Sequence, residues 1–153
     1  MRSLSALFLI AVGLMFSFEA SALDGRVSKV LPQFIDQEGR HSLSPSHFER
    51  DAYQAKLREN PTLRKGLLFR VQWSAEPSDW TQVRLRVEAR GLKGSVLQSR
   101  ILEQPVRKHG WFGSWTTLKI DGDEYKGFGE LVAWRVTLWE NNVMLGEQKS
   151  FLW

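Results

Sequence analysis

Apolar and polar residues alternate along the chain from Gly66 onward, a pattern typical of strands that bury one face. The alternation is clearest in three segments, which are Leu67–Trp73, Val83–Ala89 and Leu131–Trp139. Less regular patterns predict three further strands, at Val96–Val106, Trp115–Ile120 and Val143–Trp153. Turn-forming residues separate these segments. We therefore predict a mostly β domain in which two antiparallel sheets pack face to face.

Prolines and asparagines refine this prediction. Pro105 favours an edge position for the strand that it ends, because proline cannot donate to a ladder. For the same reason Val27–Ile35, which contains Pro32, is expected to be an edge strand or an extended arm. Asn141-Asn142 tolerates positive φ and predicts a tight hairpin turn. Phe151-Leu152-Trp153 is expected to end the last strand and to close the core with its aromatic rings.

Helical spacing precedes the alternating region. Ser44-Pro45 favours a helix start, because serine can cap a helix and proline suits its first position. Phe48, Ala52 and Ala55 then share one apolar face, joined at its flank by Tyr53 or Leu57, and Asn60-Pro61 ends the segment. We expect this single helix to lie before the sandwich and to cover an open sheet edge.

The first residues are typical of a secretory signal. Arg2 supplies a positive charge, Leu4–Phe18 is apolar, and Ala20-Ser21-Ala22 fits a cleavage site. The apolar run is shorter than the roughly 20 residues that a spanning helix needs, although an uncleaved anchor is the alternative. We expect a periplasmic or secreted protein without a membrane span in its mature chain. The expected organisation is a signal peptide at 1–22, an arm and helix at 23–65 and a β-sandwich at 66–153, the last two forming one compact unit.

Charge and cysteine content narrow the possible partners. The chain contains no cysteine, so its hydrophobic core must stabilise the fold without disulfides. Its formal net charge is +4. In an exported protein this excess suits an acidic polysaccharide, lipid head groups or an acidic protein better than nucleic acid, although ordinary solubility explains it equally well. The expected partner is an unknown envelope protein or polysaccharide, and no nucleic acid.

Residues 67–153 resemble an immunoglobulin-like or fibronectin type III-like sandwich. One strand ends in Trp73, and in such folds a tryptophan ring packs across the core. Tyr125, in Asp121-Gly122-Asp123-Glu124-Tyr125, is similar to the tyrosine corner of that family. The chain departs from the pattern because residues 126–129 separate this tyrosine from the next strand and the paired cysteines are absent. The resemblance implies an antiparallel immunoglobulin-like sandwich with one N-terminal helix, a fold that more often binds partners than catalyses reactions.

Catalytic, metal and cofactor sites are not expected. The three histidines, at positions 41, 47 and 109, lack the spacing of zinc ligands. Asp121, Asp123 and Glu124 could offer oxygen ligands to calcium, but an ordinary turn accounts for them. Serine-nucleophile and phosphate-loop motifs are absent from the sequence. We therefore expect a protein that is not an enzyme and holds no cofactor.

Tryptophan is the one compositional excess. Trp73 and Trp134 fall on the inward phase of their strands and are expected in the core. The remaining aromatic and basic residues supply candidates for a ligand or partner surface: Trp111, Phe112, Trp115, Arg84, Arg86 and Trp139. The leading hypothesis is a non-enzymatic exported protein that binds another protein at the cell envelope. A carbohydrate-binding module using the loop at 111–115 is one alternative, and a cell-wall hydrolase with two carboxylates across a cleft is the other.

Overall fold

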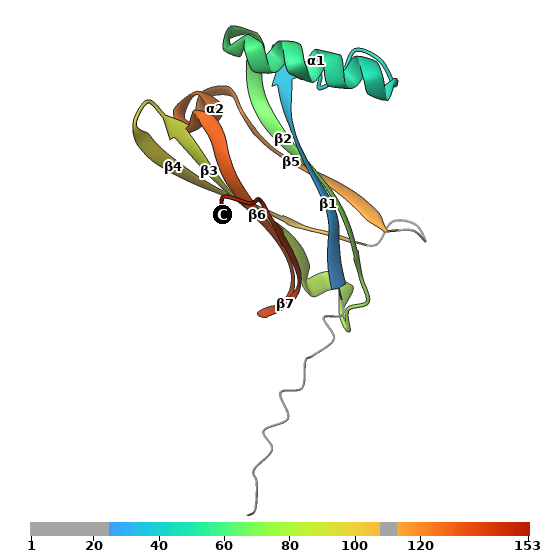
Figure 1. The fold of residues 1–153 in the computed structure, drawn as a ribbon. Coiled ribbons are helices and arrows are strands. Elements are labelled where there is room, and N and C mark those ends of the chain that lie inside the picture. The colour runs from blue at the N-terminus through green and yellow to red at the C-terminus, as the bar shows by residue number, and fades with distance from the viewer. Residues whose placement is uncertain (1–24, 108–112) are drawn as a thin grey trace, which may run out of the picture.

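The computed structural model describes residues 25–107 and 113–153, which form two antiparallel sheets facing each other (Figure 1). The predicted signal at 1–22 and the loop residues Trp111 and Phe112 lie outside the described residues. The seven strands are β1 (Gly25–Asp36), β2 (Arg64–Ala75), β3 (Val83–Lys93), β4 (Val96–Pro105), β5 (Ser114–Asp121), β6 (Glu130–Glu140) and β7 (Val143–Lys149). Two α-helices, α1 (His47–Glu59) and α2 (Gly122–Phe128), complete the regular structure, with single 3-10 turns at Pro61–Leu63 and Trp80–Gln82. The predicted mostly β fold with two antiparallel sheets is confirmed.

Strand order divides the chain between the sheets. The three-stranded sheet has the order β1-β2-β5, and the four-stranded sheet has the order β4-β3-β6-β7. β4 lies at an edge, as Pro105 predicted, and β1 is an edge strand that pairs only with β2 among the described strands. Asn141, with a φ of 51°, makes the predicted hairpin turn between β6 and β7.

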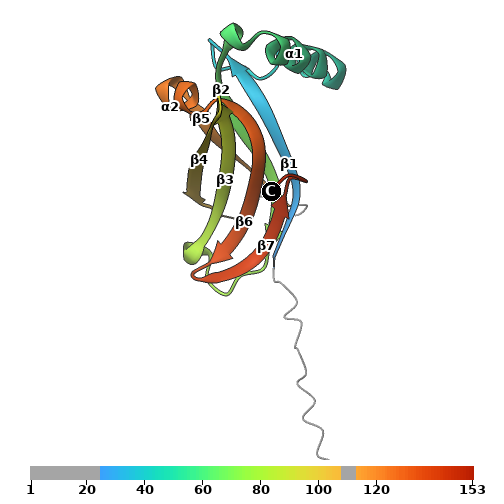
Figure 2. The ribbon, with the colours of Figure 1, turned by 60° about the vertical axis from the view of Figure 1, so that its left-hand side comes forward.

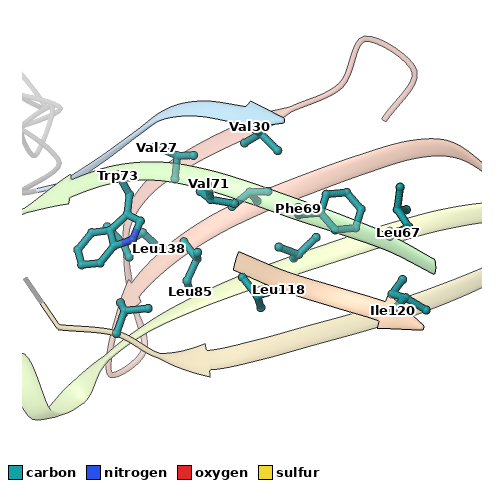
Figure 3. Close-up of a cluster of buried hydrophobic side chains, with 14 of the residues drawn as sticks. Val27, Val30, Leu67, Phe69, Val71, Trp73, Leu85, Leu118, Ile120 and Leu138 are labelled. Carbon is teal, nitrogen blue, oxygen red and sulfur yellow. The ribbon is translucent and has the colours of Figure 1, made fainter. Parts of the chain in front are cut away.

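Alternation along the strands produces a single shared core. Phe69, Val71 and Trp73 of β2 point toward Leu85 of β3 and Leu138 of β6, and all five are almost fully buried (Figure 3). β2 and β3 therefore bury the faces that their period of two predicts. Trp73 is in the core, as expected, whereas Trp134 is only partly buried and packs against the edge of that core.

The expected single helix before the sandwich is not what the structure shows. The described residues contain two helices and begin with strand β1, so within them no helix precedes the sheets. α1 lies between the paired strands β1 and β2 and begins at His47, with Ser46 rather than Ser44 as its N-cap residue. The centre of the expected apolar face is also wrong, because Phe48 is 83% exposed. Leu57, at the predicted flank, is buried, and the second buried residue of the helix is the polar Gln54.

Gln54 explains why α1 turns a polar residue inward. Its amide oxygen accepts from the backbone N–H of Phe34 at 2.8 Å, and its amide nitrogen donates to the carbonyl of Phe34 at 2.9 Å and to that of His41 at 2.7 Å. Both backbone groups of Phe34 belong to the free edge of β1. The side chain therefore replaces a neighbouring strand at this position, which confirms that the helix covers an open sheet edge.

Asp36, at the end of β1, anchors the loop that leads to α1. One carboxylate oxygen accepts from the backbone N–H groups of Glu38 and Arg40, and the other accepts from Arg40 Nε at 2.8 Å and from the Tyr53 hydroxyl at 2.6 Å. Burial alone would raise the pKa of Asp36, but the bonds from Tyr53 and Arg40 outweigh it and hold the pKa at about 2. The folded protein thus favours the ionised carboxylate.

This depressed pKa predicts an acid-sensitive contribution to stability. The ordinary pKa is 3.8, so the contribution is complete above that value and is lost as the pH falls from 3.8 through about 2. We expect the wild type to lose stability over this range more steeply than Asp36→Asn, as measured by urea unfolding at a series of pH values. Equal pH dependence in the two proteins would contradict the assignment. Asp51→Asn is the matched control, because the Asp51 side chain on α1 is 70% exposed.

The segment after β5 is helical rather than a turn. Asp121-Gly122-Asp123 was predicted to form a turn, but Asp121 is instead the N-cap residue of α2. Burial of Tyr125 and Phe128 holds this short helix against the core, between β5 and β6. The burial of these two aromatic residues at helical spacing therefore outweighs the preference of Asp121-Gly122-Asp123 for a turn.

The chain end also differs from its prediction. β7 ends at Lys149, so the last strand does not extend to Trp153. Ser150 turns the chain, donating its backbone N–H to the Trp134 carbonyl and accepting at its hydroxyl from the Trp134 backbone N–H. Trp153 then lies over the outer face of the four-stranded sheet instead of closing the core, near the C-terminal end marked in Figure 2.

Candidate functional site

The outer face of the four-stranded sheet gathers arginine and tryptophan side chains that the sequence places far apart. Arg84, Arg86 and Arg90 follow one another on the outward phase of β3. β6 contributes Arg135 and Trp139 on the same face. Trp153 from the chain end completes the set. We call these six residues the arginine–tryptophan face.

Trp139 forms one half of this face. It is directly opposite Arg84 in the register of β3 and β6, and its ring centroid lies 6.0 Å from the guanidinium carbon of Arg84 and 5.8 Å from that of Arg86. Its indole N–H donates to the Thr137 hydroxyl at 2.8 Å, which fixes the ring orientation. Both arginines therefore make cation–π contacts with a single half-buried tryptophan.

Trp153 forms the other half. The guanidinium carbon of Arg90 lies 3.9 Å from its ring centroid, and that of Arg135 lies 5.2 Å away. Ala133, which lies opposite Arg90 on the same outer phase, is only 1% exposed. The chain end is thus part of the face.

Glutamates neutralise part of the positive charge. Glu103 of β4 contacts Arg84 Nε at 3.2 Å and Arg86 Nε at 2.7 Å, and Glu88 contacts Arg135 at 2.6 Å. Within the described part of the chain, Arg90 has no ion pair, and its guanidinium makes a cation–π contact with the Trp153 ring. Because arginine carries several donors in a rigid fork, Arg90 keeps donors available to an incoming carboxylate.

The predicted site residues divide into two groups. Arg84, Arg86 and Trp139 are brought together, as just described. Trp115 lies on β5 of the other sheet, is 44% exposed, and is stacked by Arg70 at 5.3 Å from its ring centroid. Trp111 and Phe112 lie outside the described residues, so the predicted aromatic loop stays a prediction.

The predicted site residues omitted three members of the face. Arg90 and Arg135 could have been included, because they share the outward phases of their strands with Arg84 and Trp139. Trp153 gave no such signal, since its position depends on the turn at Ser150. Glu103 was missed for a third reason: its role follows from the pairing of β4 with β3, which alternation alone does not specify.

The described residues line shallow cavities, of which three lie near candidate residues or on α1. One of about 190 Å³ is lined by residues that include Trp115 and Arg107. One of about 270 Å³ is lined by residues that include Arg84 and Glu103. A third, of about 360 Å³, lies on the exposed apolar side of α1 next to Phe48. None of the three is lined by two carboxylates, the arrangement that glycoside hydrolysis needs.

The acidic and histidine residues form no metal centre within 25–107 and 113–153, because no three of them come together there. Asp121 pairs with Lys119 at 2.7 Å, Asp123 with Lys126 at 2.9 Å, and Glu124 with Arg100 at 3.5 Å. Each of these carboxylates thus has a cationic partner on the surface. The described helices include none with the length and apolar character to cross a membrane.

We found no significant match to this chain among protein-family models, curated proteins or solved structures.

Proposed function

We propose that this protein is a non-enzymatic, exported binding domain that uses its arginine–tryptophan face to hold an acidic segment of another protein at the cell envelope. The observation that carries the proposal is the stacking of four arginines on two tryptophans across one sheet face. Tryptophan and arginine are the residues that most often dominate the energy of protein interfaces. The export that the proposal assumes is supported by the signal-like residues 1–22.

We further propose that the domain is immunoglobulin-like. In support, the first, second and fifth strands share one sheet and the third, sixth and seventh share the other, as strands A, B, E and C, F, G do in that fold. Tyr125 lies between β5 and β6, where the family has its tyrosine corner. Trp73 departs from the pattern, because it lies on the second strand rather than the third.

The chemistry of the face favours carboxylates as ligands. A cation–π contact with an indole ring leaves the edge donors of a guanidinium free for planar, bidentate contacts. Arg90 is the residue expected to contribute most, because no glutamate competes for its donors within the described residues. Arg84 and Arg86 share Glu103, so an acidic ligand there would have to displace that side chain.

Binding can be measured with a defined probe, a short oligo-glutamate peptide, by following tryptophan fluorescence. Arg90→Gln should weaken binding by about tenfold or more. Arg58→Gln is the matched control, because Arg58 is exposed on α1 and its substitution removes the same charge at a position away from the face. Binding should also weaken as salt rises. Equal affinity for an oligo-glutamine peptide, or an equal loss in both variants, would refute the proposal.

Carbohydrate binding is the second candidate, and one observation favours it. Trp115 is exposed beside a cavity that Arg107 and Gln104 also line, an arrangement in which a sugar ring could stack on the indole. Titration with soluble polysaccharides should then change tryptophan fluorescence in the wild type and in Trp139→Ala, but not in Trp115→Ala. If no polysaccharide changes the wild-type signal, this candidate is excluded.

A further inference from the structure

The outer edge of β4 is the feature that points beyond the proposed function. β4 pairs with β3 alone among the described strands, so half of its backbone groups face away from the sheet. Backbone groups along β4 point alternately toward β3 and away from it. Val106 N–H donates to Val83 O at 3.0 Å, so residue 106 and every second residue before it face β3. Residues 97, 99, 101 and 103 must therefore direct their N–H and C=O groups outward. Pro105, which has no N–H, ends this row of donors.

Among residues 25–107 and 113–153, this edge lacks the protection that the edge at β1 has. Gln54 covers β1 at one end, and β7 approaches its other end so closely that a Cβ on Gly146 would lie 3.0 Å from Arg26 Cα. β4 instead exposes apolar side chains along its length: Val96 is 60% exposed, Leu97 58% and Ile101 64%. An exposed apolar edge of this kind favours addition of another strand.

The sequence of β4 is complementary to itself in one antiparallel register. When two copies are related by a two-fold axis through Ser99, Leu97 of each copy lies opposite Ile101 of the other, on the outer face. Val96 lies opposite Leu102 on the inner face. All four apolar residues of the strand thereby gain an apolar partner, and such cross-strand pairs are what stabilise a sheet.

Neighbouring registers are much poorer. An axis through Arg100 would place the two Arg100 side chains opposite each other and would set Leu97 against Glu103. An axis through Gln98 would set Leu97 against Ser99 and Val96 against Arg100. Like charges directly opposite each other destabilise a sheet, and apolar residues opposite polar ones lose the favourable pairing, so of these three registers the axis at Ser99 suits the strand best.

We infer that two copies of this chain pair through β4, antiparallel and centred on Ser99, so that their four-stranded sheets join into one continuous sheet. Residues opposite each other in a sheet point to the same side, so both arginine–tryptophan faces would lie on the same side of the dimer. The occupant of the edge is thus a second copy of the chain. This inference does not depend on the acidic-segment proposal, because the pairing needs no ligand.

Sedimentation velocity over a range of protein concentrations tests the dimer directly in the absence of any ligand. We expect the wild type to convert from monomer to dimer as its concentration rises. Ile101→Lys should weaken the dimer by about a hundredfold, because the two-fold axis makes each substitution act twice. Val143→Lys is the matched control, since Val143 is an equally exposed apolar residue (64%) on β7, at the opposite edge of the same sheet. A wild type that stays monomeric at every concentration, or a Val143→Lys variant that loses the dimer as Ile101→Lys does, overturns the inference.

Cysteine cross-linking tests the register, and the natural chain has no cysteine to interfere. Ser99→Cys should form a disulfide-linked dimer under mild oxidation, because directly opposite residues in such a pair have Cα atoms about 5.5 Å apart. Ser95→Cys should remain monomeric, since the same axis would separate the Cα atoms of the two substituted residues by roughly 27 Å, that is, about eight residues of strand. Cross-linking of both variants to the same extent, or of Ser95→Cys alone, would exclude the register centred on Ser99.

Discussion

Replacing Trp73 with alanine should lower the free energy of unfolding by about 3–5 kcal/mol, the usual cost of removing a large aromatic side chain from a core. Trp73 is 1% exposed and lies between the sheets, with its ring centroid 6.2 Å from that of Trp80. Its indole N–H donates to the Thr116 hydroxyl at 2.9 Å, which joins β2 to β5. The substitution therefore leaves a cavity and also removes the partner of a polar group. Urea unfolding followed by far-ultraviolet circular dichroism measures the effect without relying on tryptophan fluorescence.

Trp115→Ala is the matched control for that experiment. Trp115 lies on β5 opposite Gln72, the residue before Trp73 on β2. Its side chain is on the outer face of the sheet and is 44% exposed. Its replacement should cost less than about 1 kcal/mol. Trp73→Phe keeps most of the ring and loses the hydrogen bond, so about 1–2 kcal/mol is expected. If Trp73→Ala and Trp115→Ala unfold at the same urea concentration, Trp73 does not have the role assigned to it.

The β-sheet part of the fold could be predicted because each strand buries one face. In β2 and β3 every second residue is apolar, and the structure buries those residues. The local sequence pattern was therefore enough to predict which face of each strand lies in the core. The helix face could not be predicted in the same way. Gln54 is buried because the free backbone groups of Phe34 need partners, and this requirement arises only when β1 and α1 are already side by side.

The candidate site was predictable to the extent that it follows the strands. The outward phase of β3 identified Arg84 and Arg86, and the outward phase of β6 identified Trp139. Their closeness was not predictable, because it depends on β3 pairing with β6, a strand that is distant in the sequence. The contact between Arg90 and Trp153 depends further on how the chain turns after β7, which no periodicity encodes.

Arg64 links four elements of the fold, and its replacement is expected to have the second large effect. Its side chain is 2% exposed, its Nε donates to the Leu57 carbonyl at 2.5 Å, and one terminal nitrogen donates to Glu130 at 2.5 Å. The other terminal nitrogen donates to the Arg58 carbonyl, and the guanidinium carbon lies 4.1 Å from the Phe34 ring centroid. One cation therefore satisfies the last carbonyls of α1 and holds the helix against β1 and β6.

Arg64→Met should destabilise the protein by about 2–3 kcal/mol, because it leaves the buried Leu57 carbonyl and the part-buried Arg58 carbonyl without their donor while keeping most of the side-chain volume. Glu130 adds little to this loss, since its side chain is 59% exposed and water can replace the arginine. Arg64→Lys should recover only part of the stability, because one ammonium cannot reach three acceptors that a planar guanidinium serves at once.

Hydrogen exchange gives the Arg64 prediction a local readout. Amides in the last turn of α1 should exchange faster in Arg64→Met, while those of β3 and β6 change only as far as global stability requires. Arg58→Met is the control, because its exposed side chain leaves the carbonyl contact of that residue intact. Equal stability of Arg64→Met and Arg58→Met would mean that α1 is held by Gln54 and Leu57 alone. Faster exchange confined to the helix would instead show that the buried arginine fixes α1 on the sheet edge.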